Sequence, residues 1–465
     1  MNNLSILERL RSVVEDSGCV NYQSGGTIVQ RSSVRQNMGQ STRAATRRVA
    51  VVGFGNIGAA VVDILRQGQI AGLELAKVAV KDRNKPRPFV LPTEMLTTDA
   101  MEVARDPQID IVVELMGGTE IATKMVLEAL SNGKDVVTAN KGLIADYGHE
   151  VFALASKTGR HVGFRGSFVG CHSLIYELSQ ARAGVKRIKR IHAVLNGTCN
   201  YILWNMTEHG LTFEEALKGA QEKGYAESDP TEDIDGTDTA RKTRILLGLI
   251  SNSIFTSGDF SVEGIKKVTA QDIQYAGDLG YSVKLIGLIE HLKENVFYVA
   301  VHPAMLPHGS LMGSLEGANN GIETEDEYGV VSGLVAPGAG KNPTALAVAK
   351  DLVDIAEGAR SLMPTGQHKV ELDSGKDLER RYYLRLGVAD QAGVLAQICN
   401  IFWKCNISIA AVIQKEAVTP EFVPLVMTTH MARERDLLEA VKEIDRLDWV
   451  KARTNIIRIL GTERR

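Results

Sequence analysis

Cysteine is scarce in this sequence, and no pair of cysteines is spaced for a disulfide framework or a zinc ribbon. Only five cysteines occur among the 465 residues, and no Cys-x-x-Cys pair is present. They are Cys19, Cys171, Cys199, Cys399 and Cys405. An odd number of scattered thiols favours a reducing compartment, so we expect a cytoplasmic protein.

Long hydrophobic runs and an excess of positive charge are also missing. No apolar stretch approaches the roughly 18–20 residues that a membrane-spanning helix needs. The 53 basic and 56 acidic residues give a net charge of −3, which argues against a broad basic surface for nucleic acid. With 44 glycines and only 12 prolines, the chain is not collagen-like or mostly disordered, and its length predicts two to four domains.

Residues 1–46 differ in composition from the rest of the chain. No acidic residue occurs from Ser17 to Ala60, while arginine and serine accumulate. Such a segment resembles an organelle transit peptide, but Glu8, Glu15 and Asp16 do not fit that pattern. We therefore favour a disordered extension.

From residue 47 onward, short β-branched runs alternate with segments of helical period. Strands are predicted at 48–52, 75–80, 109–115, 135–139 and 161–164, and helices at 56–66 and 120–131. This alternation predicts an α/β domain, a Rossmann-type doubly wound parallel sheet with helices on both faces. We expect it to span residues 47–165, with a returning helix within 342–360.

The remaining chain reads as two further α+β parts. Residues 166–341 contain predicted helices at 213–223 and 239–251 and strands near 188–195 and 295–302, and we expect this part to bind substrate and support oligomerisation. Residues 361–380 are polar and predict a linker. A last α+β module, residues 381–465, opens with a strand at 382–388.

A glycine-rich turn follows the first predicted strand and opens a helix. Its residues are Gly53, Phe54, Gly55, Asn56, Ile57 and Gly58. The first glycine permits a tight turn, the second lets backbone approach a pyrophosphate, and the helix N-terminus supplies free N–H donors. This context predicts dinucleotide binding, with an ordinary tight turn as the alternative.

Charged residues after the second strand bear on the choice of nicotinamide cofactor. Asp82 suits the ribose 2′-hydroxyl of NAD, whereas Lys81, Arg83 and Lys85 suit the 2′-phosphate of NADP. Three cations against one acid favour NADP, although NAD is not excluded and solvated loop charges are the alternative reading.

An acidic stretch between residues 224 and 242 contains the highest concentration of side chains suited to catalysis or substrate binding. Asp238 and Lys242 are an i, i+4 pair on one helix face, with Asp235 or Thr237 available as a cap. The pair is either a surface ion pair or part of a pocket in which carboxylates bind an ammonium group while the lysine exchanges a proton. The second reading requires a lysine that is partly desolvated.

Two turns at predicted strand ends add further candidates. Lys141 stands just beyond the carboxyl end of a parallel strand, where ligands bind in open α/β sheets. The run Asn196–Tyr201 offers N–H groups, a hydroxyl and amides to a small polar substrate. Cys199 within it is either a nucleophile or, more commonly, a buried structural thiol.

These motifs, taken in order, identify a resemblance. The glycine-rich turn, Thr138-Ala139-Asn140-Lys141, Asn196–Tyr201, the stretch 224–242 and Gly338-Ala339-Gly340 with Pro343-Thr344 together resemble homoserine dehydrogenase over about residues 47–360. The resemblance implies NAD(P)-dependent, reversible reduction of L-aspartate 4-semialdehyde to L-homoserine, on the route to threonine, methionine and isoleucine.

The resemblance also implies residue roles. Lys242 would donate the proton to the carbonyl oxygen, Lys141 would assist there and contact cofactor, and Asp238 would complete the catalytic set. The substrate would be bound by Glu227, Asp238, Asp233 and Thr198. Gly224 and Gly340 would lie near the cofactor.

One position departs from the family pattern. Arg165 stands where the family usually has a glutamate that helps to hold a sodium ion. A guanidinium opposes a cation, so we expect no metal site here, and we expect Arg165 to meet the backbone carbonyls of Phe168, Gly170 and His172 instead. The alternative is a solvent-directed Arg165 beside a retained sodium ion.

The tail is similar to an ACT domain, a small ferredoxin-like module that senses amino acids. The likeness rests on residues 382–386 and on the run that contains Asp390, Gly393, Val394 and Leu395. It implies an amino-acid effector such as threonine and a homodimer or homotetramer. Two rival readings are a related NAD(P)-dependent oxidoreductase of altered substrate and a catalytically weak amino-acid sensor.

Overall fold

The computed structural model describes residues 46–168, 178, 187–256, 258–338, 340–359, 364, 366, 368–415 and 423–461. The predicted N-terminal extension therefore lies outside the described residues, apart from Thr46. Within the described ranges, no helix is long and apolar enough to cross a membrane.

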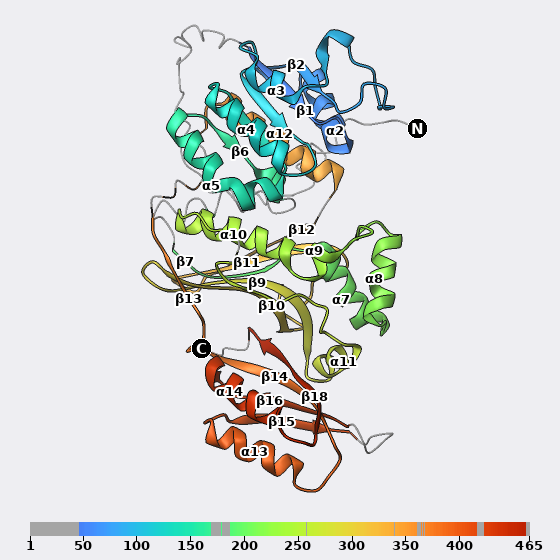
Figure 1. Cartoon of the computed structure of the whole chain (residues 1–465), viewed down its shortest axis with the longest axis vertical. Helices are drawn as coiled ribbons and strands as arrows, with labels where there is room; N and C mark the ends of the chain where they lie inside the picture. The colour runs from blue at the N-terminus through green and yellow to red at the C-terminus, as the bar shows by residue number, and fades with distance from the viewer. Residues whose placement is uncertain are drawn as a thin grey trace, which may run out of the picture. The chain divides into compact units, whose positions relative to one another are not determined.

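A six-stranded parallel sheet forms the first part of the fold and confirms the predicted doubly wound architecture (Figure 1). Its strand order is β3-β2-β1-β4-β5-β6, the order of dinucleotide-binding sheets. The strands are β1 (Arg47–Val52), β2 (Leu73–Ala79), β3 (Leu96–Thr97, after the short helix η1, Thr93–Met95), β4 (Ile111–Glu114), β5 (Asp135–Thr138) and β6 (Val162–Gly163).

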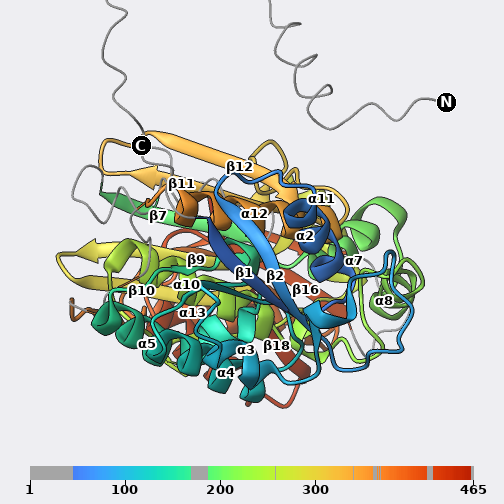
Figure 2. The same ribbon diagram turned by 90° about the horizontal axis from the view of Figure 1, so that it is seen from above.

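Both faces of this sheet are buried because its side chains alternate between two cores. Val49 and Val51 of β1 pack with α2 and α12, whereas Ala50 and Val52 join the core beneath α4 and α5. Figure 2 shows α2 and α12 on one side of β1 and β2 and α3, α4 and α5 on the other. The helices are α2 (Asn56–Arg66), α3 (Ala100–Arg105), α4 (Glu120–Ser131), α5 (Lys141–Thr158) and α12 (Lys341–Ala356).

A second, mixed sheet follows the short helix η2 (Arg165–Phe168). Its first five strands run in the order β12-β11-β7-β9-β10 and pair antiparallel. They are β7 (Ile188–Val194), β9 (Tyr281–Lys293), β10 (Val296–Pro307), β11 (Asn319–Asp326) and β12 (Val331–Pro337). The accompanying elements are α7 (Gly197–His209), α8 (Phe213–Glu222), α9 (Thr231–Ile234), α10 (Thr237–Ser251), β8 (Ser261–Val262) and α11 (Ala270–Asp278).

The C-terminal part has the order β-α-β-β-α-β, apart from the additional two-residue strand β17, and extends the same sheet through β18-β14-β16-β15. Its elements are β14 (Glu379–Val388), α13 (Val394–Lys404), β15 (Ile409–Gln414), β16 (Val423–Thr429), β17 (Ala432–Arg433), α14 (Glu434–Ile444) and β18 (Val450–Ile459). The segment expected as a linker also contributes β13 (Glu371–Asp373), which pairs with β10, and β14 begins inside it.

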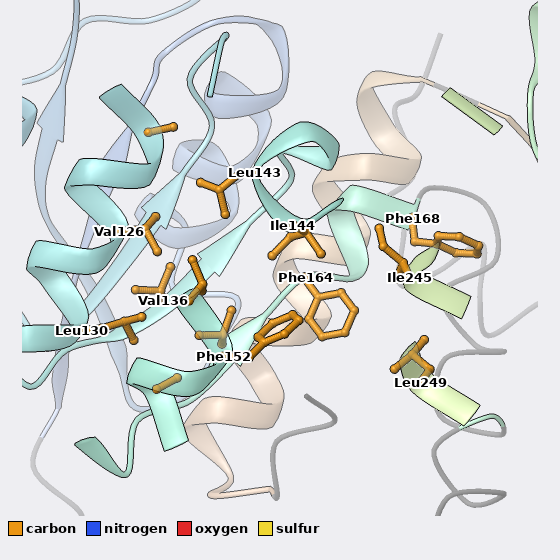
Figure 3. Packing of buried hydrophobic residues seen from close by; sticks show 14 of the residues in the cluster. Val126, Leu130, Val136, Leu143, Ile144, Phe152, Phe164, Phe168, Ile245 and Leu249 are labelled. Carbon is orange, nitrogen blue, oxygen red and sulfur yellow. The ribbon is translucent and has the colours of Figure 1, made fainter. Parts of the chain in front are cut away.

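Hydrophobic packing between α5 and α10 brings the first two parts of the fold together. In Figure 3, Ile245 and Leu249 lie near Phe164 and Phe168, within the cluster that also contains Phe152 of α5. All five side chains are at least nine-tenths buried. This shared core fixes the N-terminal end of α5 relative to α10, and these two helices carry the candidate lysines.

Candidate active site

Two lysines from different parts of the fold meet at one carboxylate. Lys141 begins α5 at the carboxyl end of β5, and its Nζ lies 2.6 Å from Asp238 Oδ1. Lys242, one turn after Asp238 in α10, places its Nζ 2.9 Å from Asp238 Oδ2. The structure thus brings together the three residues predicted as catalytic.

Burial makes this ion-pair network different from a surface pair. The side chains of Lys242 and Asp238 are 5% and 10% exposed, while that of Lys141 is 43% exposed. Burial lowers the pKa of Lys242, and the attraction of Asp238 opposes that change only in part. Burial alone would raise the pKa of Asp238, but Lys242 and Lys141 outweigh it and hold that pKa well below 3.8. Lys242 therefore meets the condition for proton exchange.

Asn196, the first residue of the predicted run Asn196–Tyr201, joins two carboxylates of the site. Its Nδ2 donates to Asp233 Oδ1 at 2.6 Å and to Asp238 Oδ2 at 3.0 Å. Its Oδ1 accepts from Cys199 N and so caps α7. The run was predicted from its amides, but the two carboxylates that Asn196 contacts lie 37 and 42 residues further along the chain.

Backbone and amide groups complete the environment of Lys242. Its Nζ donates to the carbonyl of Leu195, which also accepts from Asn320 Nδ2 at 3.1 Å. The Oδ1 of Asn320 is buried without a hydrogen-bond partner. Asn320 was not among the predicted residues because β11 is 78 residues from Lys242 in sequence, so no local pattern links the two.

Thr198 and Cys199 lie beside Asp233. The Thr198 hydroxyl donates to the carbonyl of Tyr225 at 2.7 Å, and the Cys199 thiol lies 3.2 Å from the carbonyl of Asp233. Burial raises the pKa of Cys199. Burial also raises the pKa of Asp233, and the hydrogen bond from Asn196 partly opposes that increase. A fully buried thiol of raised pKa is a structural group, so the structure favours that reading over a nucleophile.

Glu227 and the two distant glycines stand apart from the lysine network. Glu227 is exposed, and no ion pair of its carboxylate is present among the described residues. Gly224 follows α8 with φ +74°, and Gly340 precedes α12 with φ +141°. The structure therefore does not itself join these three predicted residues to Asp238.

The glycine-rich turn has the geometry that a dinucleotide requires. A Cβ on Gly53, whose φ is +108°, would lie 2.4 Å from the carbonyl oxygen of Leu115. A Cβ on Gly58 would lie 2.0 Å from the Gly53 carbonyl oxygen, whereas nothing lies within 4 Å of one on Gly55. The first and third glycines are thus needed for packing, and the second leaves open space beside the N-terminus of α2.

The cationic loop after β2 is exposed and is braced by a residue that we did not predict. Lys81, Arg83 and Lys85 are exposed, and Arg83 donates to the Leu96 carbonyl at 3.0 Å. The Arg87 guanidinium donates to the carbonyls of Asp82, Arg83 and Lys85 and lies 5.4 Å from the centre of the Phe54 ring. Arg87 therefore ties this loop to the glycine-rich turn.

Arg165 has partners other than those expected. It is buried, and its Nη1 lies 2.6 Å from both Asp351 Oδ1 and Asp354 Oδ2 of α12. Among the described residues its partners are these carboxylates and not the Phe168 carbonyl, and the solvent-directed alternative is wrong. Gly170 and His172 lie outside the described residues. Within the described ranges, no group of three or more His, Cys, Asp or Glu side chains is arranged to hold a metal ion.

Comparison with known proteins agrees with this geometry. Residues 53–165 match the family model described as homoserine dehydrogenase, NAD binding domain, and residues 174–353 match the model described as homoserine dehydrogenase. The homoserine dehydrogenase of a Synechocystis strain is 36% identical over 435 residues, which cover 90% of this chain and 100% of that protein.

Solved structures show the same likeness. A homoserine dehydrogenase from Thiobacillus denitrificans has a TM-score of 0.81 and 35% identity, covering 89% of this chain and 98% of that one. A hyperthermophilic archaeal homoserine dehydrogenase in complex with NADPH has a TM-score of 0.57 and 25% identity, covering 68% of this chain and 99% of its own. Since the sequence relative is matched over its whole length and the two lysines meet at Asp238 beside a dinucleotide-binding sheet, the chain belongs to the homoserine dehydrogenase family.

Proposed function

We propose that Lys242, Asp238 and Lys141 form the reaction centre in which this NAD(P)-dependent homoserine dehydrogenase interconverts L-aspartate 4-semialdehyde and L-homoserine. The observation that carries this proposal is the carboxylate of Asp238, which bridges two lysines 2.6 and 2.9 Å away. An absorbance assay of nicotinamide reduction with L-homoserine tests it, and turnover with either NADP or NAD is the expected result.

The nicotinamide dinucleotide, when its pyrophosphate is bound at the glycine-rich turn, would supply or accept the hydride. Lys242 donates a proton to the carbonyl oxygen of the semialdehyde, because its pKa is lowered while Asp238 keeps it paired. Lys141, which is more exposed, stabilises the negative charge that develops on the same oxygen.

The carboxylates bind the amino-acid end of the substrate. Asp233 is half-buried beside Asn196, and Glu227 is exposed and free to turn toward a ligand. We assign both to the substrate ammonium group, together with the Thr198 hydroxyl, because an ammonium group is best bound by charged acceptors.

NADP is the proposed cofactor preference, with NAD as the alternative. The archaeal relative that was solved with NADPH supports this choice, as do the exposed cations after β2. We expect the triple variant Lys81→Ala, Arg83→Ala, Lys85→Ala to lose about tenfold or more in kcat/KM with NADP, and much less with NAD, because only NADP carries a 2′-phosphate. Steady-state kinetics with both cofactors measure this, and equal losses would mean that these are solvated loop charges.

Turnover is expected to be insensitive to sodium and potassium. Arg165 fills the position of the usual acidic ligand, and Asp351 and Asp354 are already paired with its guanidinium. A fixed positive charge about 4 Å from a bound cation would cost roughly 4 kcal/mol at an effective dielectric constant near 20. NaCl and KCl titrations at constant ionic strength, against a bulky-cation salt, check this. Saturable activation by either ion would contradict it.

The C-terminal part is proposed to be a regulatory ACT domain, residues 381–465. Its β-α-β-β-α-β order and strand order β18-β14-β16-β15 are those of a ferredoxin-like module, which supports the proposal. Gly393 caps α13 with φ +91°, Val394 is buried, and Asp390 and Leu395 are exposed at this turn. These four residues are the proposed effector contacts.

L-threonine is expected to inhibit saturably through this module. Asp390→Ala should weaken the inhibition without lowering uninhibited kcat, because Asp390 is remote in sequence from the lysines and exposed. Titration of both proteins with L-threonine, and with D-threonine as control, measures the effect. Equal inhibition of both proteins would remove Asp390 from the effector site.

The proposal extends to assembly and location. A homodimer or homotetramer is supported by the edge strand β12, which exposes Val331 and Val335. A cytoplasmic location is supported by the free thiols of Cys199, Cys399 and Cys405.

A further inference from the structure

A buried carboxylate that the reaction does not use lies at the end of β4. Glu114 is 0% exposed, and no positively charged side chain pairs with it in the described part of the chain. Burial raises its pKa to about 7, against the effect of its hydrogen bonds. Burying a carboxyl group without a cation is costly, and an apolar residue would fill the same space at less cost. The hydrogen bonds of Glu114 should therefore explain why a carboxyl group is present at this buried position.

One oxygen of Glu114 holds the segment that abuts the glycine-rich turn. Its Oε1 accepts from Met116 N at 2.7 Å. The carbonyl of the intervening residue, Leu115, is the group that only a glycine at position 53 can approach. Glu114 thus fixes the backbone against which the dinucleotide-binding turn packs.

The other oxygen of Glu114 is connected, through a chain of hydrogen bonds, to the turn that precedes Lys141. Glu114 Oε2 accepts from the Thr138 hydroxyl at 2.5 Å, and that hydroxyl accepts from Asn140 N at 3.0 Å. Asn140 in turn caps α5 through its Oδ1 and donates from its Nδ2 to the Gly118 carbonyl at 2.7 Å. Lys141 is the first residue of α5, so this chain of hydrogen bonds orients the turn from which its side chain reaches Asp238.

We infer that Glu114 is a positioning residue, which holds the Thr138–Lys141 turn in register with the glycine-rich turn so that Lys141 meets Asp238. The two turns follow β1 and β5, the strands on either side of β4, and Glu114 of β4 is paired to Val52 on one side and to Thr138 on the other. The Glu114 side chain is bonded to the Thr138 hydroxyl on one side and, on the other, to Met116 N, next to the Leu115 carbonyl against which the glycine-rich turn packs. This inference rests on the proposed role of Lys141.

The test changes the residues of the Glu114–Thr138 hydrogen bond one at a time. Thr138→Val keeps the β-branched shape and removes the hydroxyl, whereas Thr138→Ser keeps the hydroxyl. Glu114→Gln retains an oxygen for Met116 N but presents an amide N–H₂ to Thr138, whose hydroxyl proton then loses its acceptor. Thr123→Val is the matched control, because the Thr123 hydroxyl of α4 is buried without a partner.

Steady-state kcat and the dissociation constant of NADPH are measured about one pH unit above the pKa of Glu114, where the carboxylate is charged. We expect Thr138→Val and Glu114→Gln each to lower kcat by about tenfold to a hundredfold, because small displacements of a catalytic group are costly. NADPH binding should stay within about twofold, and Thr138→Ser should restore most of kcat. The double variant should match either single one, since both substitutions break the same bond.

Two results would overturn the inference. The first is a kcat for Thr138→Val within about twofold of the Thr123→Val control. The second is a double variant whose loss is the product of the two single losses. Lys141→Met is assayed in parallel: if it keeps full kcat, the proposed role of Lys141 fails, whereas if only Lys141→Met is impaired, the inference on Glu114 alone fails. Should Glu114→Gln not fold, the comparison of Thr138→Val with Thr138→Ser decides.

Discussion

Lys242→Ala is expected to lower kcat by about 10²–10⁴-fold while the dissociation constant of NADPH changes little. General acid–base groups contribute losses of this size, and Lys242 is the most buried amine of the network. The dinucleotide-binding turn lies on a different helix, α2, so its glycines keep their geometry. The substitution therefore separates chemistry from cofactor binding.

Steady-state kinetics and the quenching of protein fluorescence by NADPH measure the two quantities. Lys124→Ala is a suitable control, because Lys124 of α4 is exposed and pairs with the exposed Glu120. A loss of kcat below tenfold, or a collapse of NADPH binding together with kcat, would remove Lys242 from its assigned role.

Asp238→Asn is expected to impair both stability and turnover. The substitution leaves the buried ammonium group of Lys242 without a charged partner, and breaking such a pair costs about 3–5 kcal/mol. Lys141 adds less, since its side chain is 43% exposed and water screens its charge. We expect kcat/KM to fall by about 10²-fold or more, because the two lysines repel each other once the negative charge between them is removed.

Denaturant unfolding and steady-state kinetics measure these losses, with Asp278→Asn as the matched control. Asp278 pairs with Lys415 on the surface, where both side chains are about half exposed and water screens their charges, so its substitution should cost much less stability. The pKa of Asp238 is lowered on folding, so its contribution is complete above the ordinary carboxyl pKa of 3.8 and decreases as the pH falls below that value. A stability difference from Asp238→Asn that grew on acidification would contradict the network.

Local sequence signals located the elements of the dinucleotide-binding part closely. The predicted helices 56–66 and 120–131 coincide with α2 and α4, since hydrophobic period and flanking turns determine both. The helix predicted from residue 239 begins two residues earlier, because Gly236 adopts φ +90° and the Asp235 carboxylate accepts from Thr237 N at 2.9 Å. Of the two residues predicted as the cap, neither is the N-cap: that position is Gly236, and Asp235 accepts from the first residue of the helix instead.

Contacts between distant segments account for what could not be predicted. Lys141 and Asp238 are 97 residues apart, and only the resemblance to a known family connected them. The partners of Arg165 come from a helix 186 residues further along the chain, so the sequence indicated the charge but not its neighbours. Glu114 fell at the end of a predicted strand, and its hydrogen bond to Thr138, 24 residues away, depends on how β4 and β5 pair in the folded sheet.

The most direct test of the central claim is the pH dependence of a single turnover. Enzyme saturated with NADPH is mixed with L-aspartate 4-semialdehyde, and the loss of nicotinamide absorbance is followed for wild type and Lys242→Ala. A general acid must be protonated, so the wild-type rate should fall with rising pH, with an apparent pKa below the ordinary lysine value of 10.5. Lys242→Ala should be slow and should lack this decrease. The same decrease at the same apparent pKa in Lys242→Ala would contradict the assignment of Lys242 as the proton donor.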